Sequence, residues 1–523
     1  MEANLVLTGG KIVTMDGEGT VAEAVAVKYG RIVRVGSVGD VTPLIGGGTR
    51  VVDLGERTVL PGFIDSHCHM ISEGASRMLN VDLSEEAGVY SIGDLVARLR
   101  ERADGTPAEG WVKGYQEDDS KLKERRHPTR WELDEVSGDH PVVISTVGGH
   151  FSIANSLAFE LAGVTRETPD PEGGRFDRAP ETGELTGGLH EKAIGLVVRG
   201  ETTGPTREQS YEGARRILRE CTEAGITCVY DTVGRSEIRA ALDLKNTGEL
   251  PVRVRMDVNI GLFPELNALG LYRGLGDDWL RLCGLKFFFD GAISARTAAV
   301  TEPYLNKPGF YGVMATTREV ATKTIMDAYA EGYRVSAHAN GDAAIVMFLD
   351  IMEEAQSKYP REDPRNRDIH CTVITPELVE RIRRLGILPT IFGPYVYYHG
   401  DKLIPAFGEE LLSGRQGQGH RAQRPPCAPF PPLMAIHGLV NRTTKAGKPI
   451  GRSQRVSVME AIRLYTVNAA YQSFDEDRLG SIEEGKLADM VVLGGDILTV
   501  PTDEIMDIPV EMTIIDGEIV HEL

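Results

Sequence analysis

The chain has 523 residues, of which 57 are Lys or Arg and 77 are Asp or Glu. The net charge of −20 argues against nucleic acid or an anionic membrane as a partner, because both are bound through basic surfaces. The six cysteines are scattered, so neither a disulfide framework nor a structural zinc site is expected. The sequence shows no signal segment and no apolar run of membrane-spanning length, and we therefore expect a cytoplasmic protein.

Short runs of alternating apolar and polar residues fill the first 60 residues. Three of these runs predict short antiparallel strands, at 22–27, 31–36 and 51–54. The end of the chain has the same character, and its Asp516-Gly517 pair indicates a hairpin. We expect residues 1–60 and 479–523 to build one small β-sandwich domain from both termini.

The segment from Pro61 to His69 carries the strongest chemical signal in the sequence. An apolar strand leads through Pro-Gly to Asp65, and then to His67 and His69. Residues two apart on a strand point to the same side, so the two imidazoles can bind one metal ion. Asp65 is close enough to orient the rings. A His-x-His pair alone is common, but at the carboxyl end of an apolar strand it indicates a metal site.

The same segment, Leu60-Pro-Gly-Phe-Ile-Asp-Ser-His-Cys-His69, resembles the first metal motif of the amidohydrolase superfamily of metal-dependent hydrolases. The opening residues 5–15 and the closing residues 480–493 also match this superfamily. Residues 285–291 and 337–342 are similar to the branch called amidohydrolase family 3, which includes N-substituted formamide deformylases. The resemblance implies a (β/α)8 TIM barrel together with a small β-sandwich.

The middle of the chain alternates apolar strands with amphipathic helices, which is typical of a parallel sheet. Strands are expected at 226–231, 252–258, 282–287, 334–338 and 368–370. Helices such as 207–224 and 317–331 separate them. We therefore expect an α/β (β/α)8 TIM barrel over residues 61–478, which fits the length of the chain. Residues from about 78 to 203 are richer in loops and are predicted to be an insertion over the mouth of the active site.

Chemistry in such a barrel lies where the strands end, and three more candidate ligands lie there. Lys286 ends an apolar strand and is costly to bury as an ammonium, although pairing with Asp290 is an alternative. His338 and His370 end two later strands. In the family the matching lysine is carboxylated and bridges two metals.

The resemblance therefore implies a metal site of His67, His69, Lys286, His338 and His370, supported by Asp65 and Asp290. Nitrogen ligands with a carboxylate-like bridge suit Zn²⁺ best, as one or two ions, with iron, manganese and nickel as alternatives. Three side chains are candidates for substrate contacts: His150, Tyr115 and Arg296. Of these, His150 lies in a segment that resembles a family segment near the pocket, whereas aromatic residues such as Tyr115 also serve as packing residues.

The resemblance implies hydrolysis of a C–N bond in an amide, an N-substituted formamide or a cyclic amide by metal-bound hydroxide. The reaction needs a base, which in the family is an aspartate at the end of the eighth strand. Here residues 413–428 contain no acidic residue, and Arg424 stands where the aspartate is expected. The alternatives are a catalytically impaired amidohydrolase-like protein, or a metal-dependent decarboxylase or esterase. A small-molecule substrate is the expected partner, and a homodimer stays open.

Residues 414–426 are interpreted as a frameshifted reading of the true eighth strand. The codons GCA-CAG-CGA-CCA are one set that can encode Ala422 to Pro425. When the same letters are read one base later, they give CAC-AGC-GAC, which encodes the missing His-Ser-Asp. The alternative is a genuine divergent loop.

Overall fold

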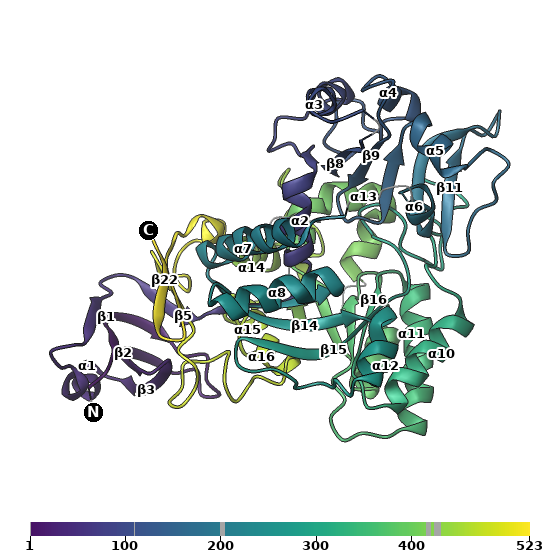
Figure 1. Cartoon of the computed structure of the whole chain (residues 1–523). Helices are drawn as coiled ribbons and strands as arrows, with labels where there is room; N and C mark the ends of the chain where they lie inside the picture. The colour runs from purple at the N-terminus through teal and green to yellow at the C-terminus, as the bar shows by residue number, and fades with distance from the viewer. Residues whose placement is uncertain (1, 109, 199–203, 415–419, 423–429) are drawn as a thin grey trace.

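The structure is a computed structural model of the whole chain, and it describes residues 2–108, 110–198, 204–414, 420–422 and 430–523. Three sheets organise these residues (Figure 1). A sheet that contains both termini lies at one end of the molecule, a barrel lies in the middle, and a separate lobe stands above the barrel. Among the helices of these residues, none combines the length and the apolar character needed to cross a membrane.

Strands from both ends of the chain form one mixed sheet. In it, β4 (Arg50–Asp53) pairs parallel with β1 (Leu5–Val13) and lies outside the main strand order. In that order the strands are β22 (Glu518–Glu522), β21 (Val510–Ile515), β20 (Met490–Leu493), β5 (Thr58–Pro61), β1 (Leu5–Val13), β2 (Val21–Lys28) and β3 (Arg31–Gly36). β20 pairs antiparallel with β5, and this pairing joins the two chain ends. Buried side chains such as Leu7, Val25 and Ile514 give this sheet a core of its own. Both termini thus share one sheet, whereas its two-layer sandwich form stays a prediction.

Eight parallel strands form the central sheet. In spatial order they are β6 (Phe63–Cys68), β13 (Ile226–Val233), β14 (Arg253–Asn259), β15 (Leu280–Phe288), β16 (Val335–Ala339), β17 (Arg367–His370), β18 (Leu388–Phe392) and β19 (His420–Ala422). The last strand lies beside the first, so the sheet nearly closes into a barrel. The eighth strand is only three residues long and pairs with the end of β18.

Helices cover the outside of the barrel (Figure 1). They are α2 (Met70–Leu79), α7 (Arg207–Glu223), α8 (Arg235–Thr247), α9 (Phe263–Ala268), α10 (Arg318–Ala330), α11 (Asp342–Lys358), α12 (Pro376–Arg384), α13 (Pro394–Gly414), α14 (Pro432–Asn441), α15 (Val458–Leu464) and α16 (Val467–Gln472). The Thr206 side chain accepts a hydrogen bond from the Gln209 N–H and begins α7. Thr466 has non-helical dihedral angles and separates α15 from α16.

The residues between α2 and α7 form a six-stranded sheet with its own helices, called here the inserted lobe. Its strands in spatial order are β11 (Gly174–Arg178), β12 (Leu185–Glu191), β10 (Phe151–Ala154), β9 (Val142–Thr146), β8 (Val112–Glu117) and β7 (Val81–Asp82). Its helices are α3 (Ile92–Asp104), α4 (Arg130–Asp134), α5 (Ser156–Ala162) and α6 (Lys192–Val197). The sequence predicted mostly loops here. The strands escape notice because they are short, and β12 contains two adjacent glycines.

Candidate metal centre and substrate cavity

The four predicted histidine ligands lie together at the carboxyl ends of the barrel strands. His67 lies in β6 and His69 follows it, while His338 and His370 come from β16 and β17. The His67 ring centroid lies 5.1 Å from that of His69 and 5.7 Å from that of His370. The centroids of His338 and His370 are 4.3 Å apart. Three separate strands therefore bring four imidazoles into one cluster.

Lys286 joins this cluster from β15 and is fully buried. Its Nζ lies 3.3 Å from His67 Nε2 and 5.2 Å from the centroid of the Phe288 ring. Asp290, the alternative partner of the lysine, accepts backbone N–H groups of Ala299, Asn340 and Gly341. Burial raises the pKa of Asp290 to about 8, although these three donors oppose the rise. Asp290 therefore supports the loop that follows His338.

Asp65 supports the first pair of histidines. Its Oδ1 accepts the backbone N–H of His67 at 3.1 Å, and it is fully buried beneath the cluster. This contact fixes the backbone of His67, which is consistent with the orienting role expected from the sequence.

The cluster fits a transition metal by its chemistry and its place in the barrel. Neutral imidazoles are preferred ligands of zinc, and a buried lysine against a histidine is costly as an ammonium. The ligand atoms do not form a ready-made coordination shell, since no three His, Cys, Asp or Glu side chains of the described residues are arranged to enclose an ion as they stand. Metal binding therefore requires the side chains to adjust around the ion.

The backbone is strained around this end of the barrel. Five non-glycine residues have left-handed φ angles: Gln116 at 67°, Glu191 at 49°, Arg296 at 59°, His370 at 82° and Cys371 at 46°. Such angles are uncommon outside glycine, and each costs about 1–3 kcal/mol. Seven other described non-glycine residues also have positive φ angles, Arg365 and Phe474 among them, so this strain accompanies the histidine cluster but does not by itself mark the site.

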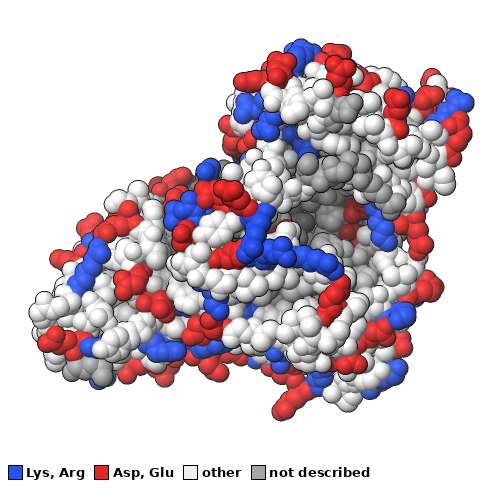
Figure 2. Space-filling model, in the orientation of Figure 1, with Lys and Arg blue, Asp and Glu red and all other residues white. Residues whose placement is uncertain are grey.

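A cavity of about 370 Å³ opens beside the histidines, between α2 and the inserted lobe. It is lined by His69, Ser72, Glu73, Ser76, Tyr115, Gln116, Ser145, Thr146, Gly148, Gly149, His150 and Phe288. Figure 2 shows that acidic and basic side chains are mixed over the visible face, which is hollowed between the lobe and the barrel. The volume suits a small molecule.

Two of the three predicted substrate contacts, His150 and Tyr115, line this cavity. His150 Nδ1 lies 2.9 Å from a carboxylate oxygen of Glu191, and its ring centroid is 4.6 Å from that of His338. Burial, together with Asp82 and Glu73, raises the pKa of Tyr115. Arg296 donates to Asp119 at 2.5 Å and stands outside the described lining, so its contact with substrate stays a prediction.

Sequence reasoning missed Glu73 and Gln116, which line the cavity, and Glu191, which contacts His150. Glu73 follows His69 by one helical turn, so a helix predicted from Met70 would have placed both side chains on the same face. Gln116 and Glu191 carry no comparable signal. The position of Arg424, and most of the segment 414–426 that was interpreted as frameshifted, lie outside the described residues.

The fold and the site match one family. A model of the amidohydrolase family matches residues 50–521, and the chain belongs to this family, as the sequence motifs predicted. The chain is 30% identical to the putative amidohydrolase YtcJ of Bacillus subtilis over 98% of both chains. It is 28% identical to the N-substituted formamide deformylase of Arthrobacter pascens, over 99% of this chain and 98% of that one.

A solved structure shares the same architecture. The crystal structure of an uncharacterized metal-dependent hydrolase from Pyrococcus horikoshii superposes with a TM-score of 0.74 at 25% identity. The match covers 95% of this chain and 99% of that chain, so it includes the inserted lobe as well as the barrel.

Proposed function

We propose that this protein is a metal-dependent hydrolase of a C–N bond in an amide, an N-substituted formamide or a cyclic amide. The observation that carries the proposal is the cluster of four histidines with Lys286 at the carboxyl ends of the barrel strands. The membership of the amidohydrolase family supports hydrolysis, and the resemblance to a formamide deformylase supports a C–N bond.

The residues of the chain divide the work between metal and substrate. The four histidines, together with Lys286 in its carboxylated form, would hold Zn²⁺ as one or two ions. A bound metal supplies Lewis acidity that activates water and polarises a carbonyl group. Glu191 holds His150 through Nδ1 and so turns this ring toward the cavity, where it would orient the substrate.

The sequence lacks the base that completes the reaction, because Arg424 stands where an aspartate is expected. We propose that the reading frame is shifted over residues 414–426 and that an aspartate belongs at the position of Arg424. Resequencing the gene tests this directly. Codons that cannot give His-Ser-Asp in a neighbouring frame contradict the proposal.

A substrate panel tests the function. The zinc-loaded chain and a version with the reading frame restored over residues 414–426 are given N-formyl, N-acyl and cyclic amides, together with matched esters and carboxylic acids, and product release is followed. We expect the restored version to turn over at least one class of amide. This turnover should be lost on chelation or in His338→Ala, and retained in a control, His521→Ala, on the terminal sheet. Turnover of esters alone, or decarboxylation alone, contradicts C–N hydrolysis.

A further inference from the structure

We propose that Glu73 and Gln116 select substrates whose non-reacting part carries hydrogen-bond donors, such as an ammonium, an amide N–H or a hydroxyl group. Alkyl and aryl groups of the same size would be disfavoured. The inference rests on the proposed function and names its class of substrate.

Glu73 places a carboxyl group in the cavity wall close to the metal ligands. Its backbone N–H donates to the carbonyl of His69 at 2.9 Å, so the first turn of α2 ties the two residues together. The residue is only 4% exposed, yet it lines the cavity. Arg77 Nε donates to Glu73 Oε1 at 3.1 Å. A carboxylate offers about four acceptor sites, so Glu73 retains capacity to accept a donor from a ligand.

The charges around Glu73 favour a donor over an acceptor. Arg77 also bonds Glu220 at 2.7 Å, so one guanidinium serves two carboxylates. Burial raises the pKa of Glu73, and the nearby Asp82 raises it further. The Arg77 charge and the hydrogen bonds of Arg77 and Gln116 lower it. No lysine or arginine is among the cavity-lining residues that the structure describes. A donor group of the substrate would therefore meet excess acceptor capacity.

Gln116 faces the same space because of an irregularity in β8. The pairing of β8 with β9 shifts register between Gly114 and Glu117, and Gln116 has a φ of 67°. Bulges of this kind re-aim side chains next to active sites. The hydroxyl groups of Ser72, Ser76 and Thr146 line the same cavity and make its wall polar.

An apolar substituent would strip water from Glu73 without replacing its hydrogen bonds. The loss of a donor to a buried acceptor lowers affinity by roughly 10- to 100-fold. Sites built to hydrogen-bond a substrate group discriminate strongly against an analogue that lacks it. We therefore expect the kcat/KM values of two matched substrates, one with and one without the donor, to differ by roughly 10- to 100-fold.

N-formylputrescine and N-formylpentylamine form a matched pair, because a terminal ammonium in one is a methyl group in the other. We expect the zinc-loaded protein, in the version with the reading frame restored, to prefer N-formylputrescine by roughly 10- to 100-fold in kcat/KM. Glu73→Gln should remove most of this preference. Glu220→Gln is the control, since it removes the other partner of Arg77 outside the cavity, and the preference should survive. A preference for the pentyl compound, or an equal loss for both compounds in Glu73→Gln, overturns the inference.

Binding separates this inference from the proposed function. Hydrolysis tests the proposed function, whereas binding tests this inference, so selectivity is also read by titration calorimetry with N-formylputrescine and N-formylpentylamine at physiological ionic strength. Tighter binding of N-formylputrescine to the wild type, lost in Glu73→Gln and kept in Glu220→Gln, supports the inference even if neither compound is hydrolysed. Equal binding of the two formamides, or tighter binding of N-formylpentylamine, contradicts it.

Discussion

The two ends of the barrel strands carry different chemistry. At the amino ends, β14, β15 and β17 begin with buried arginines: Arg253, Arg255, Arg281 and Arg367. At the carboxyl ends, the strands present nitrogen bases that cluster with one another beside a cavity. Both ends are polar and buried, but they are stabilised in different ways.

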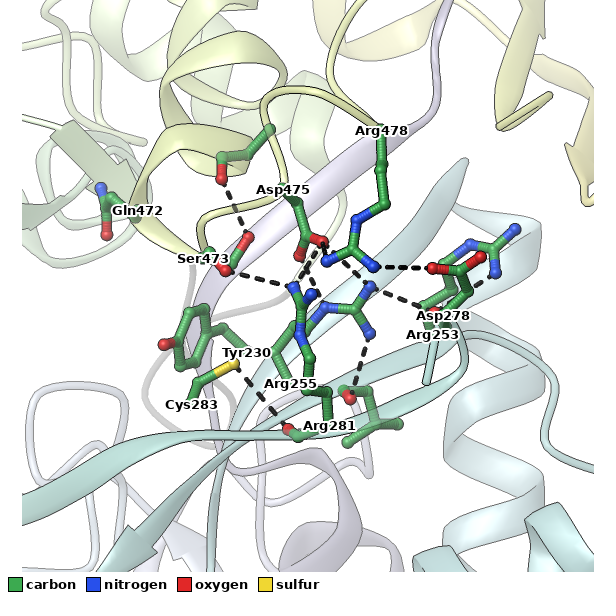
Figure 3. Close-up of polar contacts among 12 residues, drawn as sticks. Tyr230, Arg253, Arg255, Asp278, Arg281, Cys283, Gln472, Ser473, Asp475 and Arg478 are labelled. Atoms are coloured by element: carbon green, nitrogen blue, oxygen red, sulfur yellow. Dashed lines mark hydrogen bonds and ion pairs between the residues drawn. The ribbon is translucent and has the colours of Figure 1, made fainter. Parts of the chain in front are cut away.

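Opposite charges compensate each other at the amino end (Figure 3). The fully buried Asp475 accepts hydrogen bonds from Arg255 and Arg281, and it pairs with Arg478 at 2.9 Å. Arg253 Nε bonds Asp489 at 2.7 Å. These pairs fasten the barrel to the segment before the C-terminal strands.

The difference teaches that burial of polar groups does not by itself mark a functional site. Buried charges that stabilise a fold must be compensated by opposite charges, as the arginines and aspartates are at the amino end. At the carboxyl end, the clustered nitrogen bases lie beside the cavity that His69 lines, and His370 has a left-handed φ angle. In barrels the carboxyl ends of the strands carry the chemistry and the amino ends carry stability.

The largest effect on stability is expected at the amino end. Asp475→Ala leaves several buried guanidinium groups without their shared carboxylate and should cost about 3–5 kcal/mol of unfolding free energy. Asp278→Ala is the matched control, since this partly exposed carboxylate pairs with Arg478 at the edge of the cluster and with the exposed Arg31, and it should cost under about 1 kcal/mol. Chemical denaturation measures the unfolding free energy of both variants. Equal losses in the two variants would refute the stabilising role of the buried cluster at the amino end.

A second buried cluster joins the inserted lobe to α13 and gives a pH-dependent test. Lys402 Nζ lies 2.7 Å from carboxylate oxygens of both Asp118 and Asp119. Burial alone would raise the pKa of each aspartate. Lys402 and its neighbours outweigh burial and hold the pKa of each aspartate well below its usual range. This stabilisation is therefore complete above about pH 4, the ordinary aspartate range, and is lost as the pH falls toward the lowered values.

Lys402→Met should destabilise the protein by about 3 kcal/mol at pH 7, because two buried carboxylates lose a shared cation. The gap to the wild type should narrow as the pH falls below about 4, because the unfolded chain and the unpaired native aspartates of the variant take up protons there, whereas the paired aspartates of the native wild type stay ionised. Unfolding free energies measured between pH 3 and pH 7, a range chosen to span the aspartate titration, test the sign. A gap that widens in acid would contradict the assignment.

The smallest effect on stability is expected for Lys286→Met at the carboxyl end. A buried amine opposes folding, so the metal-free variant should be as stable as the wild type or more stable by about 1 kcal/mol. Bound metal should nevertheless fall at least roughly tenfold. Short carboxylates added to Lys286→Ala, which leaves more space, should partly restore the metal. A marked loss of stability in the metal-free protein would show that Lys286 is structural.

The sequence predicted the carboxyl end better than the amino end. His67 and His69 stand out because two ligands lie two residues apart on one strand. Lys286 stands out because it ends an apolar run, and His338 and His370 stand out because they end two later predicted strands. The partners Arg255 and Asp475 lie 220 residues apart, and no local pattern connects them.

The inserted lobe shows the same limit. Its strands are short, and they are stabilised by pairing with distant segments rather than by a local alternation, as between β10 and β12. The bulge that turns Gln116 into the cavity depends on the register between two such strands. The family motifs predicted the barrel and the candidate ligands, whereas the polar wall of the cavity, with Glu73 and Gln116, required the structure.

Metal content tests the central claim most directly. The wild type, His67→Ala, His338→Ala and the control His521→Ala are purified from zinc-supplemented medium and analysed for bound transition metal. The account predicts near-stoichiometric metal, most of it zinc, in the wild type and in the control, and a marked loss in the two ligand variants. A wild type without metal, or equal metal in all four proteins, would contradict it.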